Sequence, residues 1–243
     1  MFGRLVPIVC LIVCFISVPV SAQFGDLLKG LFEKGMNMSP STGLSQDTIV
    51  SGLKEALQVG AQKTIERTGI ENGYYGNEDI KILMPKKLQM FDQVLRFAGY
   101  GPQLDEFVVR MNRAAEHAAP LAKPILWEAI ASMTIKDAKG VLQGGNTAAT
   151  DYFQEKTTVQ LRKTFRPQVE QAMNQVDLVR QYKELVGSYQ AIPFVRDIAF
   201  DLDQYVVDKS LSGFFTVLAE EEKQIRTDPA ARVTDLLKEV FAQ

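Results

Sequence analysis

The side chains best suited to chemistry in this chain are acids, arginines and one amide that lie beside apolar helix faces. In a helix predicted over residues 102–119, Asp105, Asn112 and Glu116 fall next to the apolar arc of the helical wheel rather than opposite it. Polar groups in that position are expected to be partly buried, and buried polar groups need hydrogen-bond partners. We therefore predict a polar cluster on this helix.

A second group of acids lies near the end of a helix predicted over residues 202–226. Glu221 and Glu222 straddle its inner face, where two acids oppose the dipole of the helix C-terminus. Arg226 and Arg232 are the cations expected to compensate them. Two interpretations remain open: an Arg–Glu network that locks the C-terminal helices, or a carboxylate-lined site for a cation, a sugar or a basic peptide.

A glycine-rich turn is the third candidate. Gly144, Gly145 and Thr147 lead into a helix whose first N–H groups could hold an anion, with Tyr152 beside any pocket formed there. The turn lacks the Gly-Lys-Ser/Thr of a phosphate-binding P-loop. The alternative is purely structural: the glycines end one helix and Thr147 caps the next.

Composition excludes several functional classes. The 243 residues carry a formal charge of −2, so no basic surplus points to nucleic acid. Two cysteines and one histidine are too few for a zinc site of the usual kind. His117 falls on the outer arc of its helix, which predicts a solvated side chain rather than a catalytic one. We predict no metal site, no cofactor and no nucleic-acid partner.

The first residues predict export. A short basic start, an apolar run over residues 5–20 and small residues up to Ala22 are typical of a signal peptide cleaved before Gln23. The alternative is a membrane anchor, but the run is shorter than the about 20 residues that span a bilayer. Valine precedes both Cys10 and Cys14, which is not a lipidation pattern. We predict an exported, cysteine-free mature chain without a transmembrane segment.

The remainder predicts an all-α fold. After the signal at 1–22, residues 23–43 are expected to form a short amphipathic helix and a linker, and residues 44–243 a single helical domain. Apolar periodicity and capping residues indicate a bundle of about ten helices with short connections, over 45–68, 85–98, 102–119, 121–133, 134–143, 147–165, 167–176, 178–189, 202–226 and 229–241. Ile80, Ile82 and Met84 alternate before Pro85, which leaves one short extended segment open.

Several strings together resemble the bacterial family called domain of unknown function 4197. They are GLKEAL at 52–57, MNRAAE at 111–116, GGNTAATDYF at 144–153, DLDQYV at 201–206 and EEKQIRTDPAARVTDLLKEVF at 221–241. The resemblance runs from about Leu44 to Phe241. It implies exported, helical, envelope-associated proteins of Gram-negative bacteria, with no established activity to carry over. Some relatives carry lipoprotein signals, a pattern from which this chain departs.

Two functions follow as hypotheses. The first is a non-enzymatic periplasmic protein whose helical bundle binds or scaffolds an envelope protein or a small ligand. The second is an envelope hydrolase that uses paired carboxylates, Glu116 with Glu221, on a glycan. Such a pair needs its carboxyl groups about 5–9.5 Å apart in an open cleft.

Overall fold

The computed structural model describes residues 46–177, 179–180 and 200–231. These residues all belong to one compact unit. The predicted signal peptide, with Ala22 and Gln23, and the segment 23–43 lie outside the described residues. So do Arg232 and most of the helices predicted at 178–189 and 229–241.

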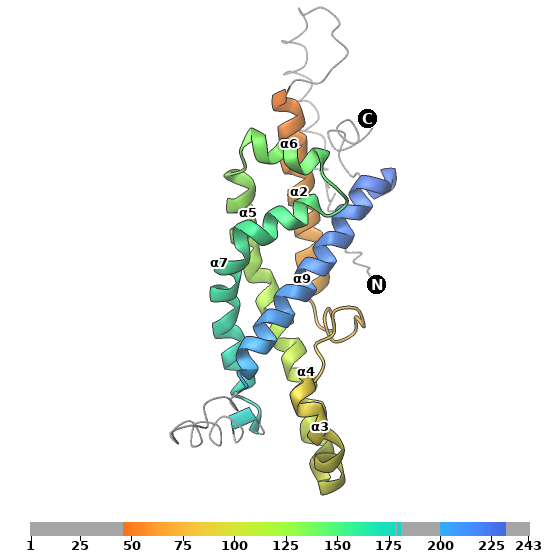
Figure 1. Cartoon of the computed structure of the whole chain (residues 1–243), viewed down its shortest axis with the longest axis vertical. Helices are drawn as coiled ribbons and strands as arrows, with labels where there is room; N and C mark the ends of the chain where they lie inside the picture. Colours follow the sequence, from red (N-terminus) through yellow and green to blue (C-terminus); the bar gives the residue numbers. More distant parts are fainter. Residues whose placement is uncertain (1–45, 178, 181–199, 232–243) are drawn as a thin grey trace, which may run out of the picture. The chain divides into compact units, whose positions relative to one another are not determined.

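The described residues are helical and contain no strand, which confirms the all-α prediction for this part of the chain (Figure 1). A π-turn, η1 (Arg96–Tyr100), and two 3₁₀ turns, η2 (Ala119–Leu121) and η4 (Pro229–Ala231), accompany the α-helices. The α-helices are α2 (Gln46–Thr68), α3 (Lys86–Leu95), α4 (Gly101–Ala118), α5 (Ala122–Ala131), α6 (Ile135–Gln143), α7 (Ala148–Met173) and α9 (Leu202–Thr227). Among these residues, no helix is long and apolar enough to cross a membrane.

The prediction of about ten helices is wrong for the described residues. If α3 and α4 are counted as one helix continued through η1, six α-helices are present. One reason is Pro167, which was expected to separate two helices but lies inside α7. Proline removes one backbone hydrogen bond and crowds the preceding turn. Phe165, Val169 and Met173 on either side are fully buried, and their packing keeps the helix continuous.

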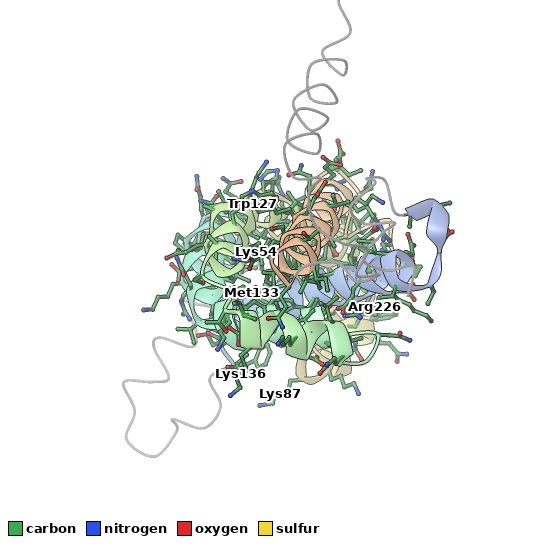
Figure 2. The ribbon with its side chains drawn as sticks, turned by 90° about the horizontal axis from the view of Figure 1, so that it is seen from above. Lys54, Lys87, Trp127, Met133, Lys136 and Arg226 are labelled. Carbon is green, nitrogen blue, oxygen red and sulfur yellow. The ribbon has the colours of Figure 1, made fainter. Side chains whose placement is uncertain are left out.

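The core lies where α7 and α9 pack against each other and against α2, α4 and α5. Helix α9 contributes apolar side chains at three- and four-residue spacing, including Val207, Leu211, Phe214 and Leu218. The view in Figure 2 shows Lys54 of α2 beside α5, where its ammonium group donates to the carbonyl oxygen of Ala131 at 3.1 Å. The central helices therefore present one shared apolar interior.

Side chains cap two of the helices whose starts the sequence predicts. Thr134 and Asp137 form a capping box at the start of α6, and the Asp201 side chain accepts from the Gln204 N–H at the start of α9. Pro85 was predicted to be the first residue of its helix, but it is the N-cap of α3, which begins at Lys86. The capping signals thus locate helix starts to within about one residue.

The sequence left open a short extended segment before Pro85, and the structure shows no strand there. Ile80, Ile82 and Met84 are buried, but residues 81–85 have no regular structure. The fully buried ring of Tyr74 anchors this segment, and its hydroxyl donates to the Ser210 carbonyl on α9 at 2.7 Å. Burial, and then the nearby Glu116 carboxylate, raise the pKa of Tyr74, which keeps the phenol protonated as a donor.

Substitution of Gly213 on α9 tests this packing. A methyl group there would lie 2.7 Å from Cε1 of Tyr74. Overpacking costs about 1–3 kcal/mol, so Gly213→Ala is expected to lower the free energy of unfolding in urea by that amount. Gly140→Ala on α6 is the matched control, because a Cβ there meets nothing within 4 Å and alanine favours helix. Equal stability of Gly213→Ala and the parent would contradict the contact.

Candidate functional site

Glu222 of α9 occupies the N-terminus of α7. One carboxylate oxygen accepts from the Ala149 N–H at 2.8 Å. The other accepts from the N–H and the hydroxyl of Thr150 at 2.8 and 2.9 Å. The first N–H groups of a helix have no partner within the helix and carry partial positive charge, so they favour an anion at this place. The anion predicted for the glycine-rich turn is therefore supplied by the chain itself.

Arg226 completes this arrangement one turn later on α9. Its guanidinium donates twice to Glu222, at 3.0 and 2.8 Å, and once to the Val141 carbonyl near the end of α6 at 2.8 Å. Figure 2 shows Arg226 where the end of α9 passes α6. Both side chains are buried, with 8 and 12% exposed for Glu222 and Arg226. We call Glu222, Arg226 and their partners on α6 and α7 the Glu222 network.

The glycine-rich turn therefore works differently from the capping prediction. Thr147 is at the N-cap position of α7, but its side chain makes no capping hydrogen bond, because Glu222 fills that role. A Cβ at Gly144 would lie 2.4 Å from the Cβ of Ala148, so glycine is required by close approach. A Cβ at Gly145 would meet no atom within 4 Å, so close approach does not require glycine at that position.

Tyr152 does not line an anion site. Its hydroxyl donates to the Ala129 carbonyl on α5 at 2.9 Å, and its side chain is buried between these helices. Burial, and then the negative charge of Asp137, raise the pKa of Tyr152. A protonated phenol that bridges two helices is a structural donor.

Glu221 is also buried, but its partner comes from a different helix. Arg67 in the last turn of α2 donates to Glu221 at 2.6 Å and to Glu220 at 2.9 Å. Both inward acids of α9 are thus compensated, Glu222 by the predicted Arg226 and Glu221 by an arginine that the sequence did not indicate. Arg67 is distant in sequence, so no local spacing could have identified it.

Glu116 of α4 holds the segment between α2 and α3. One carboxylate oxygen accepts from the N–H groups of Tyr74 and Tyr75, each at 3.1 Å, and the other accepts from Arg113 at 2.6 Å. Arg113 also donates to Glu71 and Asn72 in the same segment. Arg113 precedes Glu116 by three residues, a helical spacing that could have predicted this pair. We call Glu116, Arg113 and these partners the Glu116 network.

Asn112 acts on the same segment through its amide group. Its Oδ1 accepts from the Ile82 N–H at 2.8 Å, and its Nδ2 donates to the Ile82 carbonyl at 2.9 Å. These are the two bonds that a neighbouring strand would exchange with Ile82. The side chain therefore replaces a β-partner, which explains how an extended segment is buried without a strand.

The prediction that Asp105, Asn112 and Glu116 form one partly buried cluster is wrong for Asp105. Asn112 and Glu116 are buried, but the side chain of Asp105 is 66% exposed. It accepts from Arg96 at 2.7 Å, and this hydrogen bond lowers the pKa of Asp105. Asp105 lies in the first turns of α4, next to η1. His117 is exposed, as predicted.

The two acids of the predicted catalytic pair, Glu116 and Glu221, are enclosed and paired. Glu221 borders one surface hollow and Glu116 a separate one, and only Ile70 borders both. Both carboxylates are at most 5% exposed and each bonds to an arginine. Within the described ranges, every buried side-chain nitrogen and oxygen has a hydrogen-bond partner. No group of three or more His, Cys, Asp and Glu there could hold a metal ion.

A family model described as Protein of unknown function (DUF4197) matches residues 43–242, nearly the whole chain. The chain belongs to this family. The resemblance found in the sequence strings is thereby confirmed. The match to the DUF4197 family spans the Glu116 and Glu222 networks. No curated protein and no solved structure matches the chain.

Removing the charge of Glu222 tests its structural role. Glu222→Gln removes the carboxylate charge that faces the Arg226 guanidinium, and breaking a buried ion pair costs about 3–5 kcal/mol. We expect a drop of about that size in the free energy of unfolding, measured by urea denaturation. Glu220→Gln is the matched control, because its pair with Arg67 is 37–40% exposed and worth about 1 kcal/mol or less. Equal effects of the two substitutions would contradict the account.

Replacing Asn112 tests whether its side chain takes the place of a neighbouring strand for Ile82. Asn112→Leu leaves both polar groups of Ile82 buried without their partner, at a cost of about 1–3 kcal/mol each. We expect amide hydrogen exchange at Ile82 to become faster by more than at core positions of α7. Unchanged protection of the Ile82 N–H would show that this bond does not hold the segment.

Proposed function

We propose that this chain is an exported, non-enzymatic helical protein of the periplasm that binds or scaffolds a partner of the cell envelope. The observation that carries the proposal is the use of the buried acids. Glu116, Glu221 and Glu222 accept hydrogen bonds from the chain's own N–H, hydroxyl and guanidinium groups. Acids used in this way hold helices together and do not present a free carboxylate to a substrate.

The proposed location rests on the first residues of the chain. The basic start, the apolar run over 5–20 and the small residues before Gln23 favour export and cleavage. The family resemblance, which implies envelope-associated proteins, points the same way. The partner is an envelope protein or a small ligand.

The hydrolase alternative receives no support from the site. A glycoside hydrolase needs one acid to give a proton and another to attack or activate water within the same cleft. Glu116 lies in the Glu116 network with Arg113, and Glu221 pairs with Arg67 beside a different hollow. Each carboxylate is therefore held by an arginine of its own.

Cell fractionation followed by intact mass measurement tests the location. We expect the protein in the periplasmic fraction with a mass that corresponds to a chain starting at Gln23. Ala22→Arg is the control for processing, because signal peptidase requires a small residue there, and it should keep the mass of the full chain. A cytosolic protein that retains residues 1–22 would contradict export.

The non-enzymatic assignment has its own test. Glycan fragments released from envelope material are measured for the parent, Glu116→Gln and Glu221→Gln, together with the stability of each variant. We expect no release above background from any of them and reduced stability in both variants. Release that is lost in either variant while its stability is unchanged would establish the hydrolase instead.

A further inference from the structure

The turn between α3 and α4 carries the most exposed aromatic side chain among the described residues. Phe97 in η1 is 97% exposed, and Tyr100 at the end of η1 is 45% exposed. Figure 1 shows α3, η1 and the start of α4 extending past the ends of α7 and α9. We call residues 96–103 the α3–α4 tip. A phenylalanine at such a position gains nothing from the fold that exposes it.

The backbone of the α3–α4 tip is ordered by local hydrogen bonds. Residues 96–100 form a π-turn, and the Arg96 N–H donates back to carbonyl groups of Asp92 and Gln93. Gly99 has a φ of 93°, the left-handed region that favours glycine, and this residue turns the chain between the helices. A backbone N–H that is paired within the chain, like that of Arg96, can approach hydrocarbon at lower cost than an unpaired one.

The charges around the α3–α4 tip balance. Arg96 is its single charged residue, and it pairs with Asp92 at 2.9 Å and Asp105 at 2.7 Å. Residues 86–106 contain three basic and three acidic side chains, which gives a net charge of zero. The tip therefore offers no electrostatic attraction to an anionic surface and no unpaired cation that insertion would desolvate.

The chemistry and size of the α3–α4 tip favour lipid over a protein partner. Of its other exposed residues, alanine, glycine and proline carry no side-chain donor. Arg96 is already paired with two acids, and Gln103 contributes one amide group. Two aromatic side chains bury about 150–250 Å² each, well below the about 800 Å² per partner of a stable protein interface. Phenylalanine and tyrosine are suited to the boundary between acyl chains and headgroups, where a ring enters the apolar region and a hydroxyl stays wet.

We propose that the α3–α4 tip inserts Phe97 into the interfacial region of a phospholipid bilayer, with Tyr100 at the level of the headgroups. The inference rests on the proposed envelope location, which brings the chain to a membrane surface. The binding is apolar and reversible, and it does not depend on anionic lipid.

Co-sedimentation with vesicles of phosphatidylethanolamine and phosphatidylcholine tests the proposal on the protein recovered from cells. Phe97→Ser is expected to lower the partition coefficient about 10- to 100-fold, the equivalent of removing one buried phenylalanine side chain. Ile135→Ser is the matched control, because Ile135 is a 50% exposed apolar residue on α6, away from the tip in Figure 1. Higher salt should leave the binding of the parent unchanged.

A fluorescence measurement separates the α3–α4 tip from any contribution of residues 1–22. Trp127 on α5 is the one tryptophan of the chain, and Phe97→Trp adds a second. We expect lipids brominated in their acyl chains to quench the added indole, while the parent with Trp127 alone stays unquenched. Quenching of the added indole reports insertion of the α3–α4 tip whether or not the chain is exported. A wrong prediction of the cellular location can therefore be distinguished from a wrong prediction of membrane insertion.

Two results would overturn the proposal. The first is equal vesicle binding by Phe97→Ser and the parent together with no quenching of the indole at position 97. The second is an envelope protein that is retained by the parent and lost with Phe97→Ser, again without quenching. That second result would assign the α3–α4 tip to a protein pocket.

Discussion

The described helices depend on one buried ion pair placed at a helix end. Glu222 would be costly to bury alone, since an ionised carboxylate loses its hydration. The N-terminus of α7 and the guanidinium of Arg226 replace that hydration with charge-assisted hydrogen bonds. Because Arg226 also reaches the Val141 carbonyl, the pair fixes α6, α7 and α9 to one another.

The Glu116 network solves a related problem at a segment that has no regular structure. Residues between α2 and α3 bury apolar side chains, so their backbone polar groups need partners that no helix or sheet supplies. Glu116 satisfies two N–H groups and Asn112 satisfies both polar groups of Ile82. Polar residues on α4 thereby substitute for secondary structure, and the Tyr74 ring can pack against Gly213.

The sequence predicts the helices better than it predicts the tertiary contacts between their side chains. Periodicity and capping locate the starts of α6 and α9, and the wheel correctly places Glu222 inside, because these features depend on neighbours in the chain. It misses the contact of Arg67 with Glu221, since only tertiary packing joins α2 to α9. It also misplaces Asp105, because a wheel shows which face a residue lies on but not where along the helix another helix covers it.

The central claim is that Glu222 and Arg226 act as one structural unit. A double-mutant cycle between Glu222→Gln and Arg226→Met, read from urea unfolding, tests it most directly. We expect a coupling energy above about 1 kcal/mol, because each single change breaks the Glu222–Arg226 charge pair while the other side chain stays in place. Effects that add to within about 0.5 kcal/mol would contradict the claim.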